Sequence, residues 1–223
     1  MKRLTLTLAV VMLLLAVVSM PGCKRKIPNA IPKNFDYGSW TDTTYRNDFF
    51  GFSISAPKNW TISGQEEIKA IMDEAQKMDF VNQKELEKQR KIADVTSANL
   101  FFAKRYTDEE ALELEEFNPN LMLLVENISL PGKKIDLAQY VVICRQNLQK
   151  SVPSLVIKSQ SNKKIGGQDF TSLQIQMTVE GVPISQEHLI CLKNGFALLF
   201  GLTYMDDSDK KQMDDIMATL KWD

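Results

Sequence analysis

The sequence predicts an α/β (α+β) fold, an α/β/α sandwich around a central, mainly antiparallel sheet of about six strands. Three observations lead to this prediction. Runs with a period of two indicate strands, runs with helical spacing indicate amphipathic helices, and both kinds recur along the chain. The last strands follow one another through tight turns. Consecutive hairpins of this kind require an antiparallel sheet that helices then cover.

The first part of the folded region contains a strand and a helix. Residues 50–56 alternate apolar and small side chains and end at Pro57, which is typical of a half-buried strand. Ser63 and Glu66 have the spacing of a capping box, and the apolar residues after them repeat at helical spacing. Residues 82–91 are mostly charged and indicate a solvated helix or a mobile segment.

The middle of the chain contains three strands and a helix. The pattern predicts strands over 98–106 and 121–128, and the second is apolar on both faces at its start, so we expect it to be covered on both sides. Residues 156–157 indicate a short strand. Asp136 caps a helix. The core face of that helix comprises Leu137, Val141, Cys144 and Leu148.

The C-terminal third predicts a series of hairpins and a final helix. The glycine pair 166–167 turns the chain into a strand with regular alternation. Asn194 and Gly195 form the strongest hairpin signal, because both residues tolerate positive φ. Asp207 or Ser208 caps the last helix.

Residues 1–22 have the pattern of a lipoprotein signal peptide. Lys2 and Arg3 give a positive start, and residues 4–18 form an apolar run. This run is shorter than the ~20 apolar residues that a spanning helix needs. We therefore expect the segment to direct export.

The end of this run contains a candidate lipidation site. Gly22 and Cys23 match a bacterial lipobox, whereas Met20 and Pro21 depart from its usual pattern. We expect Cys23 to carry acyl chains that anchor the chain in the membrane, since two or three chains anchor stably. Two alternatives stay open, an uncleaved signal anchor and plain secretory cleavage after Ser19.

The remaining chain divides into a tether and a domain. Residues 23–46 contain Pro28, Pro32 and few apolar positions, which predicts a tether before a domain over 47–223. The chain has 27 basic and 28 acidic residues, so no basic field indicates nucleic-acid binding.

Short motifs stand between the predicted elements: Asn-Asp-Phe-Phe-Gly-Phe at 47–52, Pro57, Trp60, Gly-Gly at 166–167, and Lys-Asn-Gly at 193–195. Over roughly residues 45–222, this order resembles the PsbP-like domain of the PsbP/Mog-type superfamily. That superfamily includes an extrinsic photosystem II subunit, a nuclear-transport cofactor and many bacterial lipoproteins. The resemblance implies an α/β/α sandwich in which residues 64–93 form a helical insertion. It assigns no partner and no site residue, because members bind different partners.

Few residues in the domain suggest chemistry. His188 is the only histidine, and no local motif supplies an acid–base partner, so we expect a structural or surface role. Cys144 and Cys191 either pair in an oxidising compartment or stay free, and we favour free buried thiols. The acidic run 108–116 lacks the spacing of a calcium loop and indicates a solvated face. We expect no catalytic residue, no metal and no cofactor.

The sequence thus predicts a lipid-anchored, non-catalytic binding or accessory protein on the extracytoplasmic face of the cell membrane. Its partners would be the membrane, through Cys23, and a protein of unspecified identity. One alternative is a lipoprotein that captures a solute or a metal for a transporter. The other is a cryptic hydrolase, which would need His188 beside a nucleophile in a cleft.

Overall fold

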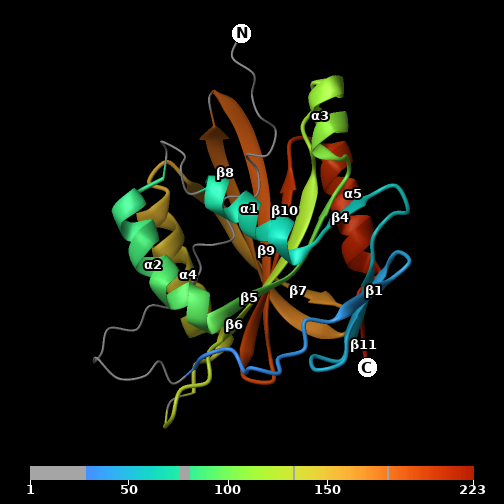
Figure 1. Ribbon diagram of the computed structural model, residues 1–223. Helices are drawn as coiled ribbons and strands as arrows, with labels where there is room; N and C mark the ends of the chain where they lie inside the picture. Colours follow the sequence, from blue (N-terminus) through green and yellow to red (C-terminus); the bar gives the residue numbers. More distant parts are fainter. Residues whose placement is uncertain (1–28, 76–80, 133, 180) are drawn as a thin grey trace.

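The computed structural model describes residues 29–75, 81–132, 134–179 and 181–223 (Figure 1). Within them the chain is an α+β protein with five helices and two antiparallel sheets. The predicted signal peptide and Cys23 lie outside the described residues. None of the described helices is long and apolar enough to cross a membrane.

The large sheet has seven strands in the described part of the chain, one more than the sequence predicts. Neighbouring strands pair antiparallel throughout, as predicted. The order across the sheet is β4 (Thr61–Ser63), β5 (Ser97–Lys104), β6 (Asn120–Asn127), β10 (Phe196–Tyr204), β9 (Val182–Lys193), β8 (Gln168–Val179) and β7 (Val156–Ile165).

Strand β6 shows why this sheet needs a cover on each face. All eight of its residues are buried, which confirms the expectation for a strand that is apolar on both parities. Met122 and Leu124 belong to one core cluster, whereas Leu121 and Leu123 belong to the other. The sheet therefore separates two hydrophobic cores.

Helices α1 (Gln65–Ala75), α2 (Gln83–Thr96) and α4 (Leu137–Ser151) contribute to the first core. Residues 82–91 were predicted to form a solvated helix or a mobile segment; the structure confirms the helix, but the buried Leu86 side chain shows that it is not wholly solvated. The apolar stripe of α2 is narrow, and most of the residues around it are charged, so the sequence pattern does not reveal it. Asp136 caps α4 through a capping box with Gln139, as predicted.

The second core is covered by helix α5 (Asp207–Ala218) together with a small sheet. The small sheet has the order β1 (Ser39–Thr41), β2 (Thr44–Asn47), β3 (Phe52–Ser55) and β11 (Lys221–Trp222). The predicted three-layer sandwich therefore holds in part, because one outer layer combines a helix with strands. Asp206 caps α5 by accepting a hydrogen bond from the Asp209 amide at 2.8 Å, one residue before the predicted caps.

The predicted tether needs correction over its described part, residues 29–46. This segment contains β1 and most of β2, and the Tyr45 side chain is 1% exposed in the second core. The Tyr45 hydroxyl donates a hydrogen bond to the Tyr37 carbonyl at 2.7 Å. Folded structure therefore begins before residue 47.

Candidate binding pocket

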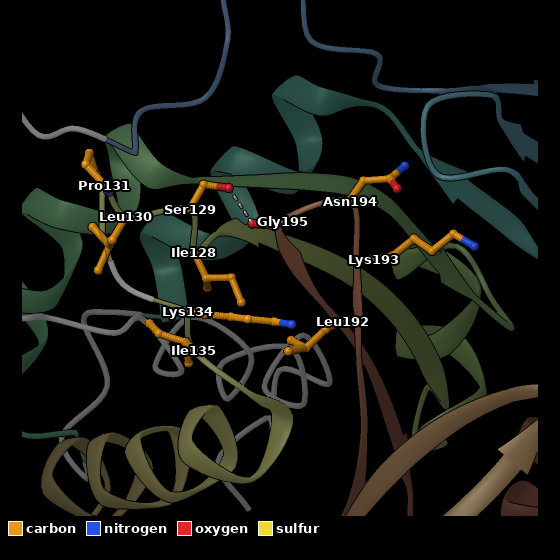
Figure 2. A pocket seen from close by; sticks show the side chains of 10 residues that line it. All are labelled: Ile128, Ser129, Leu130, Pro131, Lys134, Ile135, Leu192, Lys193, Asn194 and Gly195. Atoms are coloured by element: carbon orange, nitrogen blue, oxygen red, sulfur yellow. Dashed lines mark hydrogen bonds between the residues drawn. The ribbon is translucent and has the colours of Figure 1, made fainter.

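An open pocket of about 610 Å³ lies where the loop after β6 meets the β9–β10 turn (Figure 2). This volume is in the range of small-ligand sites. Ten residues line it: Ile128, Ser129, Leu130, Pro131, Lys134, Ile135, Leu192, Lys193, Asn194 and Gly195.

The β9–β10 turn positions one wall of the pocket. Asn194 and Gly195 have φ values of 52° and 80°, which confirms the hairpin that their sequence predicts. The Gly195 carbonyl then accepts hydrogen bonds from the Ile128 amide at 3.0 Å and the Ser129 hydroxyl at 3.1 Å. These bonds hold the loop after β6 against the turn.

Gly195→Ala is expected to lower the free energy of unfolding by about 2–3 kcal/mol, because φ is positive and the new Cβ meets the Ser129 hydroxyl. That Cβ would clash with Ser129 Oγ. Gly167→Ala is the matched control, since its φ is +90° and no atom lies within 4 Å of a Cβ there. Urea unfolding of both variants separates the contact from the backbone strain. Equal losses would contradict the steric argument.

The lining combines apolar walls with positive charge. Ile128, Leu130 and Leu192 offer apolar surface, while Lys134 and Lys193 are basic, and none of the ten lining residues is acidic. Figure 2 shows Lys134 extending from its loop toward the β9 wall at Leu192. Such a site suits a ligand that has an apolar part and an anionic group.

The N-terminal segment of the described chain lies directly beside this pocket. The Asn29 side chain donates a hydrogen bond from Nδ2 to the Asn127 backbone carbonyl at 2.6 Å, and the Asn127 side chain donates one from Nδ2 to the Ala30 backbone carbonyl at 3.1 Å. The Ile31 amide bonds the Val95 carbonyl at 2.8 Å. Asn127 immediately precedes the pocket residue Ile128.

His188 lies inside the domain and away from this pocket's lining. Its ring is 0% exposed, and Nε2 lies 3.2 Å from Gln186 Oε1. Burial lowers the pKa of His188 to about 4, so the ring is neutral at physiological pH. Of the two roles that the sequence allows, structural or surface, this enclosure fits the structural one. The hydrolase alternative required His188 in a cleft beside a nucleophile, and the enclosed ring does not have that arrangement.

Cys144 and Cys191 lie in different cores. Cys144 of α4 packs in the first core and Cys191 of β9 in the second, so the sheet stands between the two thiols. Both are free, which confirms the interpretation that the sequence favoured over a disulfide. Burial raises the pKa of each thiol well above its ordinary value, which keeps the sulfur uncharged.

The acidic run 108–116 forms helix α3 (Asp108–Leu114) and its C-terminal cap. Its carboxylates serve local contacts: Glu110 accepts a hydrogen bond from the Thr107 amide, and Glu116 accepts one from the Tyr106 hydroxyl. Among the described residues, no group of three or more carboxylate, histidine or cysteine side chains is placed to hold a metal ion.

The sequence did not predict the pocket residues. Lys134, Ile135 and Leu192 are ordinary loop and strand residues by pattern, and only the Asn-Gly turn signalled part of the wall. Cys23, the one site residue that the sequence predicts, lies outside the described residues.

No family model matches the sequence, and no curated protein matches it either. Among solved structures, CyanoP, the cyanobacterial PsbP of Synechocystis sp. PCC 6803, is 11% identical, and the match covers 92% of this chain and 99% of CyanoP with a TM-score of 0.50. LpqN of Mycobacterium tuberculosis is 12% identical over 76% of this chain and 82% of LpqN, with a TM-score of 0.42.

A protein of Bacteroides thetaiotaomicron is 14% identical over 77% of this chain, with a TM-score of 0.43. The match spans only 45% of that protein's length. At these identities a likeness concerns the fold alone, and CyanoP is the match of these three that supports it. The chain therefore has the PsbP-like fold that the sequence resemblance predicts.

Proposed function

We propose that the chain is a lipid-anchored extracytoplasmic protein that binds a partner without catalysing a reaction. The observation that supports this proposal most is the position of Asn29, six residues after Cys23 and hydrogen-bonded beside an apolar pocket. The lipobox-like Gly22–Cys23 pair and the PsbP-like fold agree with it.

Cys23→Ala is expected to move the protein out of the detergent-soluble membrane fraction or to leave it as an unprocessed precursor, because the acyl chains would be lost. Fractionation of cells, with mass measurement of the N-terminal peptide of the unaltered protein, checks this outcome. Cys144→Ala is the control and should stay on the membrane, since that thiol is buried in the domain. A mature protein that keeps its membrane attachment without Cys23 would contradict the anchor.

The pocket supports a second function, capture of a small amphipathic solute for a transporter. Its apolar walls and two lysines favour an organic anion over a metal ion, which needs convergent oxygen, nitrogen or sulfur ligands. Native mass spectrometry of the protein purified from its own cells distinguishes the two functions. A small molecule bound in a one-to-one ratio to the protein would support solute capture over the accessory function.

A further inference from the structure

One end of the domain gathers the pocket, the beginning of the described chain and exposed aromatic rings. We name it the proximal end and define it by Asn29, Tyr37, Phe49, Pro131, Lys134 and Lys193. The sheet topology fixes its place, because Phe196 after the β9–β10 turn pairs with Asn127 at the end of β6. Helix α3 joins the other ends of β5 and β6 and so lies at the opposite end (Figure 1).

Two large aromatic side chains of the proximal end face solvent. Phe49 is 41% exposed and Tyr37 is 46% exposed. The Asn194 side chain donates a hydrogen bond from Nδ2 to the Phe49 backbone carbonyl at 2.6 Å, which ties residue 49 to the turn that walls the pocket. Tyrosine concentrates at the boundary between water and lipid, and phenylalanine is typical of the apolar faces that bind there.

The charges at this end are arranged in favour of an anionic surface. Lys134 and Lys193 form no ion pair with another described residue, and Lys193 Nζ lies 5.3 Å above the Trp222 ring. The nearby acidic groups have local partners: Asp136, two residues after Lys134, accepts a hydrogen bond from the Gln139 backbone amide at 2.8 Å. Arg46 pairs with Asp48 at 2.6 Å and Asp223 at 2.9 Å, and Asp36 accepts the Asp48 and Phe49 amides at 3.1 Å.

The length of chain before Asn29 limits how far this end can lie from a membrane anchor. Asn29 follows Cys23 by six residue steps along the chain. Fully extended, they span at most about 20 Å. If Cys23 is lipidated, as in the proposed function on which this step rests, Asn29 stays within that distance of the bilayer. Lys24, Arg25 and Lys26 then add positive charge next to the lipid headgroups.

We propose that the proximal end docks on anionic phospholipid, with a headgroup phosphate at Lys134 and apolar contacts in the pocket. The acyl chains of Cys23 itself would leave the two lysines without a counter-charge, so a bilayer phospholipid fits the lining better. Docking holds the domain upright on the membrane. Helix α3, with its acidic run and the exposed Leu112 and Leu114, then points away from the bilayer toward a partner.

The test uses the full processed protein, purified with its anchor and reconstituted into vesicles. Pro131→Cys carries an environment-sensitive dye, and Leu112→Cys on α3 is the control position. Both native domain thiols are buried and stay unlabelled. In vesicles that contain phosphatidylglycerol, the emission of the dye at position 131 should shift to the blue, and added salt should reverse this shift. The emission of the dye at position 112 should not change. In pure phosphatidylcholine neither should shift.

Each lysine should contribute about five-fold to the ratio of docked to undocked protein. Lys134→Ala combined with Lys193→Ala should therefore lower that ratio by on the order of thirty-fold. The matched control is Lys150→Ala with Lys158→Ala, which removes the same charge near the start of β7 at the opposite end. No shift at position 131, a shift without anionic lipid, or equal effects of the two pairs would overturn the proposal. Flotation of the vesicles measures whether the protein is anchored, and the dye measures whether the domain is docked. The two measurements therefore distinguish a failure of docking from a failure of the anchor.

Discussion

The double substitution Lys163→Met, Lys210→Met is expected to lower the free energy of unfolding by about 3–5 kcal/mol, because it leaves the Glu187 carboxylate buried without a cation. The Glu187 side chain is 0% exposed. Its Oε1 accepts hydrogen bonds from Lys163 Nζ and Ser172 Oγ, each at 2.5 Å. Lys210 Nζ lies 3.2 Å from Oε2 in an ion pair.

Removal of the carboxylate should cost less than removal of the cations. Lys163 and Lys210 are 37% and 21% exposed, so each ammonium group can turn toward water when Glu187→Gln removes its partner. Burial by itself raises the pKa of Glu187, but the hydrogen bonds from Lys163 and Ser172 and the charge of Lys210 outweigh it and lower that pKa. Adding Glu187→Gln to the double lysine variant should therefore recover most of the lost stability.

Urea unfolding followed by tryptophan fluorescence measures these differences. The control is Lys164→Met with Lys211→Met, because these neighbours pair with Asp169 and Asp215, whose side chains are 77% and 65% exposed. Exposed pairs contribute little, so the control should lose less than about 1 kcal/mol. A control that loses as much, or a triple variant that recovers nothing, would show that the buried carboxylate is not the source of the cost.

Some features with a local cause were predictable from the sequence, but the predicted capping box of Ser63 and Glu66 does not form, because Ser63 ends strand β4 and its buried hydroxyl has no hydrogen-bond partner among the described residues. The cap of α4 depends on Asp136 and Gln139 within one turn, and the β9–β10 turn depends on the two residues that adopt positive φ. Strand β6 was recognisable because five successive apolar residues leave neither face for solvent.

Strands without an apolar alternation were missed or shortened. Strand β7 was predicted over 156–157 and runs over Val156–Ile165, but most of its residues are exposed, so the sheet edge leaves no period of two. Strands β1 and β2 are three and four residues long. They follow a stretch that contains Pro28 and Pro32, and this pattern is typical of a linker. Their stability comes from long-range pairing with β3.

The candidate site itself was not predictable, since its walls come from segments far apart in the sequence. The loop at 128–135 meets 192–195 only because β10 pairs with both β6 and β9. The same holds for Cys144 and Cys191, whose separation depends on which face of the sheet each side chain occupies. A local sequence pattern does not determine which strands pair, nor which of the two cores a buried side chain joins.

His188 should make the domain less stable in mild acid. Burial lowers its pKa to about 4, well below the ordinary value of 6.5. Between these two pH values the unfolded chain binds a proton that the folded chain does not, so the unfolded state gains stability as the pH falls. We expect a loss of about 3 kcal/mol between pH 6.5 and pH 4 from this residue, with no contribution above pH 6.5 and none further below pH 4.

His188→Gln isolates this contribution, because glutamine keeps a donor toward Gln186 and does not titrate. Urea unfolding of both proteins from pH 7.5 to pH 4.5 gives two stability curves, and the carboxylates titrate in both. The unaltered protein should lose stability faster than the variant as the pH falls below 6.5, whatever their offset at neutral pH. Parallel curves would mean that the folded domain accepts the proton on His188. The ring would then be open to water, which would contradict its burial in the domain.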